Sequence, residues 1–129
     1  MNTIMKHHDL FFTDEGVLLS DSTKVRMIAY KDIVFFVTDR PYVIIGTEKK
    51  ERIYVQTSMS RIAKCLPSCF CMCSQSVIIN LSYVNAYEND QHTFRIYLRN
   101  GCIINASRRY HNILKTQIVS FKKMMMNRT

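Results

Sequence analysis

Four of the five cysteines stand close together, and closely spaced thiols could bind a metal ion or carry redox chemistry. Cys65, Cys69, Cys71 and Cys73 follow the spacing C-x3-C-x-C-x-C, whereas zinc sites typically use C-x2-C pairs that aim two thiolates at one ion. On a strand, alternate cysteines lie about 6.6–6.8 Å apart, too far to share one tetrahedral ion without a bend. We therefore expect a buried strand, with free cysteines as small apolar residues, and keep a thiol metal or redox protein as the alternative.

Groups that could perform catalysis are sparse. His7, His8, His92 and His111 form no HExxH pair, and the sequence has no Gly-rich phosphate loop. No nucleophile and base stand at a spacing that pairs them. We predict that the protein is not an enzyme, with no catalytic residue, no cofactor and no metal site.

An arginine pair stands at the start of the last helical pattern. Ser107 is a plausible helix N-cap, and Arg108 and Arg109 follow it. The helix dipole disfavours positive charge at this end. A phosphate bound there would meet both guanidiniums and the backbone N–H groups together. The alternative is that both arginines are simply solvated.

A polar step, Ser74-Gln75-Ser76, interrupts an apolar run from Phe70 to Leu81. Buried, these side chains would need hydrogen-bond partners. At a corner between two strands they could instead face a ligand, and a glutamine amide matches the N6 and N7 atoms of adenine in the major groove. For Asn80, in the same run, we expect a role in capping or bridging backbone groups, with base reading as the alternative.

Short strands must position these groups. Segments rich in Val, Ile, Phe and Tyr alternate with polar turns, and "DIVFFVT" and "YVIIG" form a predicted hairpin with Pro41 at its rim. Asn100-Gly101 predicts a second hairpin. The strand segments are "GVLL", "KVRMIAY", "DIVFFVT", "YVIIG", "RIYVQ", "FCMCSQSVIIN", "SYVNAYE", "TFRIYLR" and "CIINA".

Two helices complete the pattern. The first lies in "TSMSRIAKCLP", capped by Thr57 or Ser58 and ended by Pro67. The second is the C-terminal helix that follows Ser107. Its expected buried face holds Tyr110, Ile113, Leu114, Ile118, Phe121 and Met125, which recur at helical spacing.

Composition bounds the class of protein. A chain of 129 residues with 47% apolar residues fits one globular domain. The longest apolar run, "IVFFV", is too short to cross a bilayer, and the start lacks the apolar core of a secretory signal. We expect a cytoplasmic protein with no membrane partner. Because five cysteines are an odd number, they cannot form a complete disulfide framework.

The formal net charge of +8 is unevenly placed. Residues 91–129 hold eight basic residues and no acid, whereas residues 1–90 hold ten of each sign. A one-sided basic segment is typical of a phosphate-rich partner.

Together these segments resemble the LytTR family of bacterial DNA-binding domains over roughly residues 32–118. The resemblance rests on "DIVFFVTDRPYVII", "SMSRIAKCLP", "FCMCSQSVIIN" and "GCIINASRRYHNILK" in one register. The sequence departs from the family at Ser74-Gln75, where the family usually carries His-Arg, and at Met72, where an arginine is frequent. This region has therefore lost positive charge.

The resemblance implies a mainly β fold, elongated and antiparallel, with one short helix and a C-terminal helix. It divides the chain into a β-rich N-terminal extension (residues 1–31) that packs on a DNA-binding domain (residues 32–129). Loops would read successive major grooves of double-stranded DNA. Carried over by position, the DNA-binding residues are Thr38, Asp39, Arg40, Ser74, Gln75, Ser107, Arg108 and Arg109.

The resemblance also implies a sequence-specific transcription regulator that binds repeated half-sites as a homodimer. The family usually joins this module to a receiver domain, and we expect the residues before the match to be too few for one. Control would then come from abundance, a partner, or a separate sensor or regulator protein. The lost His-Arg motivates an alternative: a degenerate LytTR protein-interaction module that acts by heterodimerisation with a full-length regulator.

Overall fold

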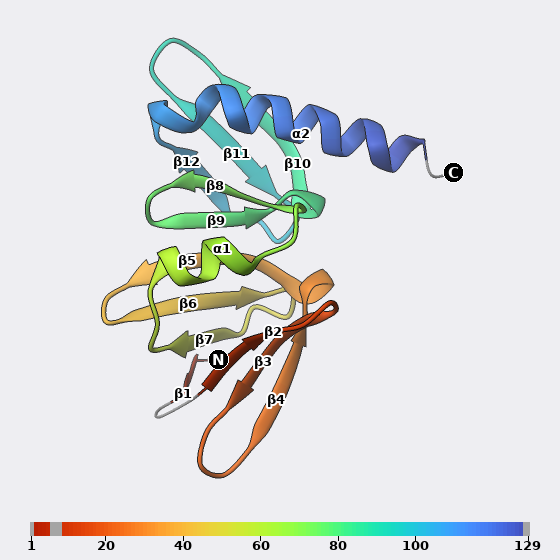
Figure 1. Cartoon of the computed structure of the whole chain (residues 1–129). Coiled ribbons are helices and arrows are strands. Elements are labelled where there is room, and N and C mark those ends of the chain that lie inside the picture. The colour runs from red at the N-terminus through yellow and green to blue at the C-terminus, as the bar shows by residue number, and fades with distance from the viewer. Residues whose placement is uncertain (1, 6–8, 128–129) are drawn as a thin grey trace. The chain divides into compact units, whose positions relative to one another are not determined.

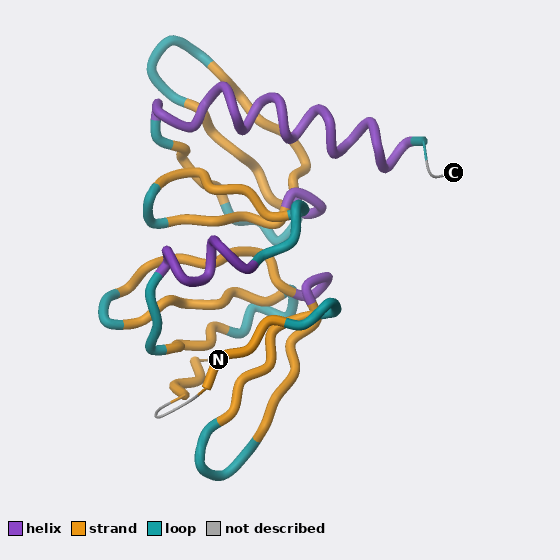
Figure 2. Tube along the Cα trace, viewed as in Figure 1, coloured by secondary structure: helices purple, strands orange, loops and turns teal. Residues whose placement is uncertain are grey.

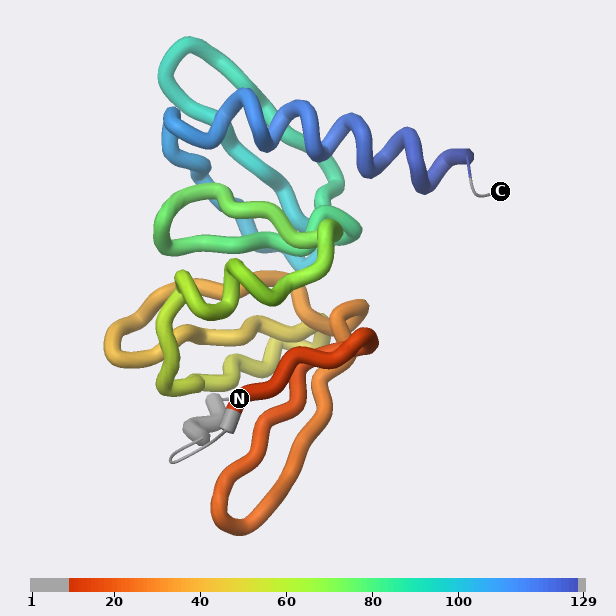
Figure 3. The backbone as a smooth tube through the Cα atoms, viewed as in Figure 1, coloured from red at the N-terminus to blue at the C-terminus, as the bar shows by residue number. Residues whose placement is uncertain are grey.

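The computed structural model describes residues 2–5 and 9–127, and they form a mainly β chain. Contacts divide it into two compact units with the boundary between Leu66 and Pro67. Figure 1 gives the element labels, Figure 2 separates helix, strand and loop, and Figure 3 traces the backbone. The predicted class, mainly antiparallel β with a short helix and a C-terminal helix, is confirmed. The predicted division into residues 1–31 and 32–129 stays a prediction.

The first unit contains two groups of strands and one helix. Strands β2, β3 and β4 form an antiparallel sheet, and four further strands are hydrogen-bonded in the order β1-β7-β6-β5, with β1 parallel to β7. The elements are β1 (Asn2–Met5), β2 (Asp9–Phe12), β3 (Gly16–Ser20), β4 (Val25–Ala29), the 3-10 turn η1 (Tyr30–Asp32), β5 (Ile33–Asp39), β6 (Tyr42–Thr47), β7 (Arg52–Val55) and α1 (Met59–Cys65).

The first predicted hairpin is confirmed. β5 pairs with β6 from Ile33 opposite Thr47 to Asp39 opposite Tyr42, and Pro41 lies in the turn between the strands. Most apolar side chains of both strands are buried, so the hairpin contributes much of the core of this unit, with Ile33, Val34, Phe35, Phe36, Val43, Ile44 and Ile45. Gly46 belongs to this packing, because a Cβ there would lie 2.3 Å from the Phe35 ring.

Helix α1 also agrees with the prediction from the sequence. Ser58 is its N-cap, and the Ser58 hydroxyl accepts a hydrogen bond of 3.3 Å from the Arg61 N–H. Met59 and Ile62 are buried, as their helical spacing predicts. The helix ends at Cys65, two residues before Pro67.

The second unit joins a hairpin, a three-stranded antiparallel sheet and a long helix. β8 pairs with β9, and β10, β11 and β12 form the sheet, while α2 packs on β8 and on η2. The elements are β8 (Phe70–Ser74), β9 (Val77–Asn80), the 3-10 turn η2 (Leu81–Tyr83), β10 (Val84–Asn89), β11 (Phe94–Leu98), β12 (Ile103–Ala106), the 3-10 turn η3 (Arg108–Tyr110) and α2 (His111–Met126).

The turn between β11 and β12 contains the predicted Asn-Gly pair. Gly101 has a φ of +90°, a conformation that side chains with a Cβ rarely adopt. Its N–H donates to the Leu98 carbonyl at 3.0 Å, which closes the turn. This hairpin is therefore confirmed.

Two expectations for the last helix are wrong. Ser107 precedes the 3-10 turn η3 rather than α2, and its hydroxyl makes no capping hydrogen bond. The expected buried face is also too wide: Leu114 and Ile118 are buried, whereas Ile113 is 55% exposed and Met125 is 42% exposed. Although α2 packs on β8 and η2, these contacts leave Ile113 and Met125 largely exposed, so the covered face is narrower than the helical spacing suggests.

Candidate nucleic-acid interface

The polar step of the sequence forms the turn between β8 and β9. Gln75 and Ser76 are exposed and Ser74 is half-buried. The Ser74 hydroxyl accepts a hydrogen bond of 3.1 Å from the Ser76 N–H, which holds the turn without using the Gln75 side chain. We considered two interpretations of Ser74-Gln75-Ser76: buried polar side chains, or a corner between two strands. The corner is therefore the correct one.

A backbone hydrogen bond joins this turn to the arginine pair. The Ser107 N–H donates to the Cys73 carbonyl at 2.9 Å, so the start of η3 lies against the end of β8. The β8–β9 pairing has a bulge between Met72 and Ser74, which breaks the regular ladder and leaves the Cys73 carbonyl to this long-range partner. Two segments more than thirty residues apart in sequence thus meet at one corner of the second unit.

The two arginines are exposed and lie in η3 rather than in the first turn of α2. Tyr110 separates them from the first residue of α2, so the dipole penalty expected from the sequence is reduced. The Arg109 guanidinium lies 5.8 Å from the centre of the Tyr110 ring. Among residues 10–127, whose side chains the structure describes, neither arginine forms an ion pair with a carboxylate.

Histidine contacts fix the start of α2. The His111 ring packs against Phe94 with centroids 5.2 Å apart, and its Nε2 lies 3.2 Å from the Ala106 carbonyl oxygen. Phe94 is fully buried in β11. The segment that carries the arginines is therefore held at both ends, by Cys73 before it and by the core after it.

The second unit has only two acidic residues, and both have local roles. Glu88 accepts a hydrogen bond from the Tyr97 hydroxyl and lies 3.8 Å from Arg95. Asp90 accepts hydrogen bonds from the backbone N–H groups of His92 and Thr93, which lower the pKa of its carboxyl. This unit also holds eight basic residues, so most of the net charge of +8 of the sequence belongs to it.

The remaining predicted DNA-binding residues lie in the first unit. Thr38 and Asp39 end β5, and Arg40 lies in the β5–β6 turn. Asp39 and Arg40 are exposed and Thr38 is half-buried. Three of the eight predicted residues thus share this turn, and the other five share the corner of the second unit.

The strand cysteines belong to the core. Cys71 and Cys73 are buried in β8, whereas Cys69 lies in the turn before the strand, so the three do not form one regular row. Burial raises the pKa of Cys71 to about 11 and raises the pKa of Cys73 further. Thiolate is the form that binds metals, and it is disfavoured at both sites. In the part of the chain that the structure describes, no three His, Cys, Asp or Glu side chains gather as a metal site.

Asn80 has the capping role that we expected. Its side chain is almost fully buried, and its Oδ1 accepts hydrogen bonds from the Ser82 N–H at 3.0 Å and the Ser82 hydroxyl at 2.8 Å. These bonds fix the start of η2. The prediction that the histidines form no catalytic site involves four residues. Two of them, His7 and His8, lie outside the described residues.

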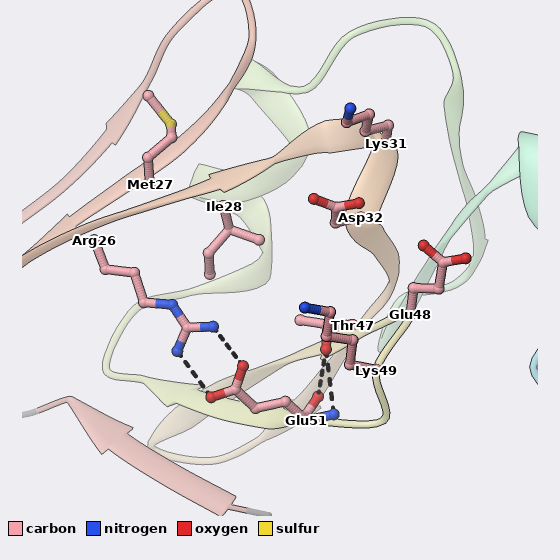
Figure 4. A pocket seen from close by; sticks show the side chains of 9 residues that line it. All are labelled: Arg26, Met27, Ile28, Lys31, Asp32, Thr47, Glu48, Lys49 and Glu51. Carbon is pink, nitrogen blue, oxygen red and sulfur yellow. Dashed lines mark hydrogen bonds and ion pairs between the residues drawn. The ribbon is translucent and has the colours of Figure 1, made fainter.

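The first unit contains a charged pocket that no motif in the sequence predicts (Figure 4). The pocket holds about 320 Å³, and Arg26 of β4 and Glu51 before β7 form a two-bond ion pair beside it. The pair fastens the β2–β3–β4 sheet to the loop between β6 and β7. The lining residues are Arg26, Met27, Ile28, Lys31, Asp32, Thr47, Glu48, Lys49 and Glu51, which come from segments that no local pattern connects.

Within residues 2–5 and 9–127, no helix has both the length and the apolar character that a membrane crossing needs.

Comparisons with known proteins agree with the fold. No curated protein matches the chain. Among solved structures, a LytTr DNA-binding domain from Bacillus cereus is similar, with a TM-score of 0.70 and 17% sequence identity, over 82% of this chain and 98% of that one. The family model of the LytTr DNA-binding domain matches residues 23–119. The chain therefore belongs to the LytTr family, a family of DNA-binding domains rather than of enzymes.

Proposed function

We propose that the protein binds double-stranded DNA at specific sequences and regulates transcription. The observation that carries the proposal is the hydrogen bond between Ser107 and Cys73, which brings two exposed polar segments to one corner of a basic unit. Family membership supports DNA as the partner.

The chemistry of the corner suggests separate roles for its side chains. Arg108 and Arg109 would bind phosphate or the O6 and N7 atoms of guanine, since a guanidinium can donate two parallel hydrogen bonds to either. Gln75 would pair with an adenine edge. Ser74 and Ser107 would donate hydroxyl hydrogen bonds to phosphate oxygens.

The β5–β6 turn would make a second contact with the duplex. Arg40 is exposed there and would anchor a phosphate, with Thr38 and Asp39 beside it. Arginine at such a turn fixes position along the duplex more than it reads sequence. We further propose that two copies bind repeated half-sites, under the control of a separate sensor or regulator protein.

In vitro selection from a random duplex library tests this function. Wild-type protein should enrich a repeated motif, and the Gln75→Ala variant should enrich the same motif with less preference at one base pair, because a bidentate contact discriminates by about 1–3 kcal/mol. A library that remains random after selection by wild-type protein would refute sequence-specific binding.

The second candidate function is protein interaction without DNA binding. It is favoured by Ser74-Gln75 and Met72, uncharged residues at positions where basic side chains are usual in the family that the sequence resembles. This function predicts heterodimerisation with a full-length regulator and negligible affinity for DNA. A purified chain that binds a duplex by itself would exclude it.

A further inference from the structure

A groove in the second unit lies between β10 and the C-terminal half of α2. It holds about 410 Å³, and its apolar lining includes Val84 and Tyr87 of the strand and Ile118 and Val119 of the helix. Val119 is 38% exposed, so apolar surface remains open to solvent. An open apolar groove of this kind is typical of a surface that binds another molecule.

The geometry of the groove favours a helix over an added strand. β10 is at the edge of its sheet, but its pairing with β11 has a bulge at Asn85, between Val84 and Ala86. A bulge disrupts the regular series of backbone groups that a new strand would need. From Ile118 to Met126 the groove follows α2 for about 12 Å, enough to contact about two turns of a second helix.

The charge of the groove selects the kind of helix. Lys122 and Lys123 line it, and none of the described residues that line it is acidic. Burial and the nearby charge of Arg99 lower the pKa of Lys122, so positive groups are already crowded here. A second copy docked by the same face would bring lysines against lysines, which opposes association. Carboxylates at the rim would relieve this repulsion.

We propose that this groove binds an amphipathic helix of a partner protein, with an apolar face flanked by glutamate or aspartate. The site shares no residue with the eight proposed for DNA. The unit would then bind nucleic acid at the β8–η3 corner and a regulatory protein beside β10, and the two activities can be measured separately.

A designed peptide tests the proposal on the full chain. The probe is a fluorescein-labelled helix with leucines three and four residues apart and glutamates at the flanking positions. We expect saturable binding, measured by fluorescence anisotropy. Val119→Asp and the double variant Lys122→Glu/Lys123→Glu should each weaken it about tenfold or more. The double variant changes only exposed side chains, so it answers the question even if the first variant folds poorly.

Two controls separate this site from general attraction. Ile113→Asp makes the same kind of change on the same helix, at a residue that is 55% exposed and lies outside the groove, and should leave peptide binding unchanged. A scrambled peptide of equal charge should bind about tenfold more weakly. The proposal is overturned if neither peptide binds, if both bind equally, or if the lysine variant binds the peptide like wild type. It is also overturned if that variant loses duplex binding as severely as an Arg108→Ala/Arg109→Ala variant, since the lysines would then serve DNA.

Discussion

Replacing Arg108 and Arg109 together by alanine should weaken DNA binding while leaving the fold intact. Both side chains are exposed, and within the described residues neither forms an ion pair. The contact of the Arg109 guanidinium with the Tyr110 ring, 5.8 Å from the ring centre, is worth about 0.5–1 kcal/mol at an exposed site. The double variant should therefore unfold at nearly the wild-type urea concentration.

The expected effect on binding depends on what the arginines touch. Each phosphate contact contributes about 0.9 to the slope of log K against log salt, so losing two contacts should flatten the slope by about 1.8. Between about 50 and 200 mM salt, that difference corresponds to about a twelvefold smaller loss of affinity. If an arginine instead binds guanine, its loss should cost about 1–3 kcal/mol and reduce preference at that base pair.

The assay is a fluorescence-anisotropy titration of a selected duplex at several salt concentrations. Arg95→Ala is the matched control, because Arg95 lies in the same basic unit but is paired with Glu88. We expect the control to keep the wild-type slope. The reasoning is refuted if the double variant matches wild type in both slope and affinity, or if Arg95→Ala has an equal effect.

Three further predictions concern stability. Cys73→Ser should lower the free energy of unfolding by about 1–3 kcal/mol in urea denaturation, because it buries a hydroxyl in an apolar site. The same substitution at the exposed Cys65 should change the free energy by less than about 0.5 kcal/mol. Equal effects of the two variants would contradict the burial of β8. Asn80→Ala should cost about 1–3 kcal/mol by the same measurement, since it leaves the N–H and the hydroxyl of Ser82 without their acceptor; an unchanged midpoint would show that this cap is dispensable. The pKa of Asp90 is lowered in the folded state by backbone hydrogen bonds, so its contribution to stability is present above its ordinary pKa of 3.8 and is lost as the pH falls below it. The Asp90→Ala variant should therefore lose less stability than the wild-type protein as the pH falls. An acid-unfolding transition equal to that of the wild type would argue against this effect.

Local patterns in the sequence predicted much of the fold. The β5–β6 hairpin follows from two runs rich in β-branched and aromatic residues around a Pro-containing turn, and the β11–β12 turn follows from Asn-Gly. Helix α1 follows from Ser58 and the spacing of its buried residues. In each case the interactions that decide the structure lie within about fifteen residues.

Long-range contacts decide the parts that the sequence did not reveal. Ser107 looks like a helix cap, but its N–H donates to Cys73 and the chain takes a 3-10 turn before α2. Ile113 has helical spacing, yet it stays 55% exposed because no described element covers it enough to bury it. The sequence could suggest both Gln75 and the arginines as candidates, but only the fold reveals that their segments meet.

The most direct test of the account is an NMR titration of the full chain with a duplex recovered by selection. We predict that the side-chain amide of Gln75 and the guanidinium N–H signals of Arg108 and Arg109 shift together and saturate at one protein per half-site. The account is contradicted if these signals stay in place while the duplex binds elsewhere on the protein.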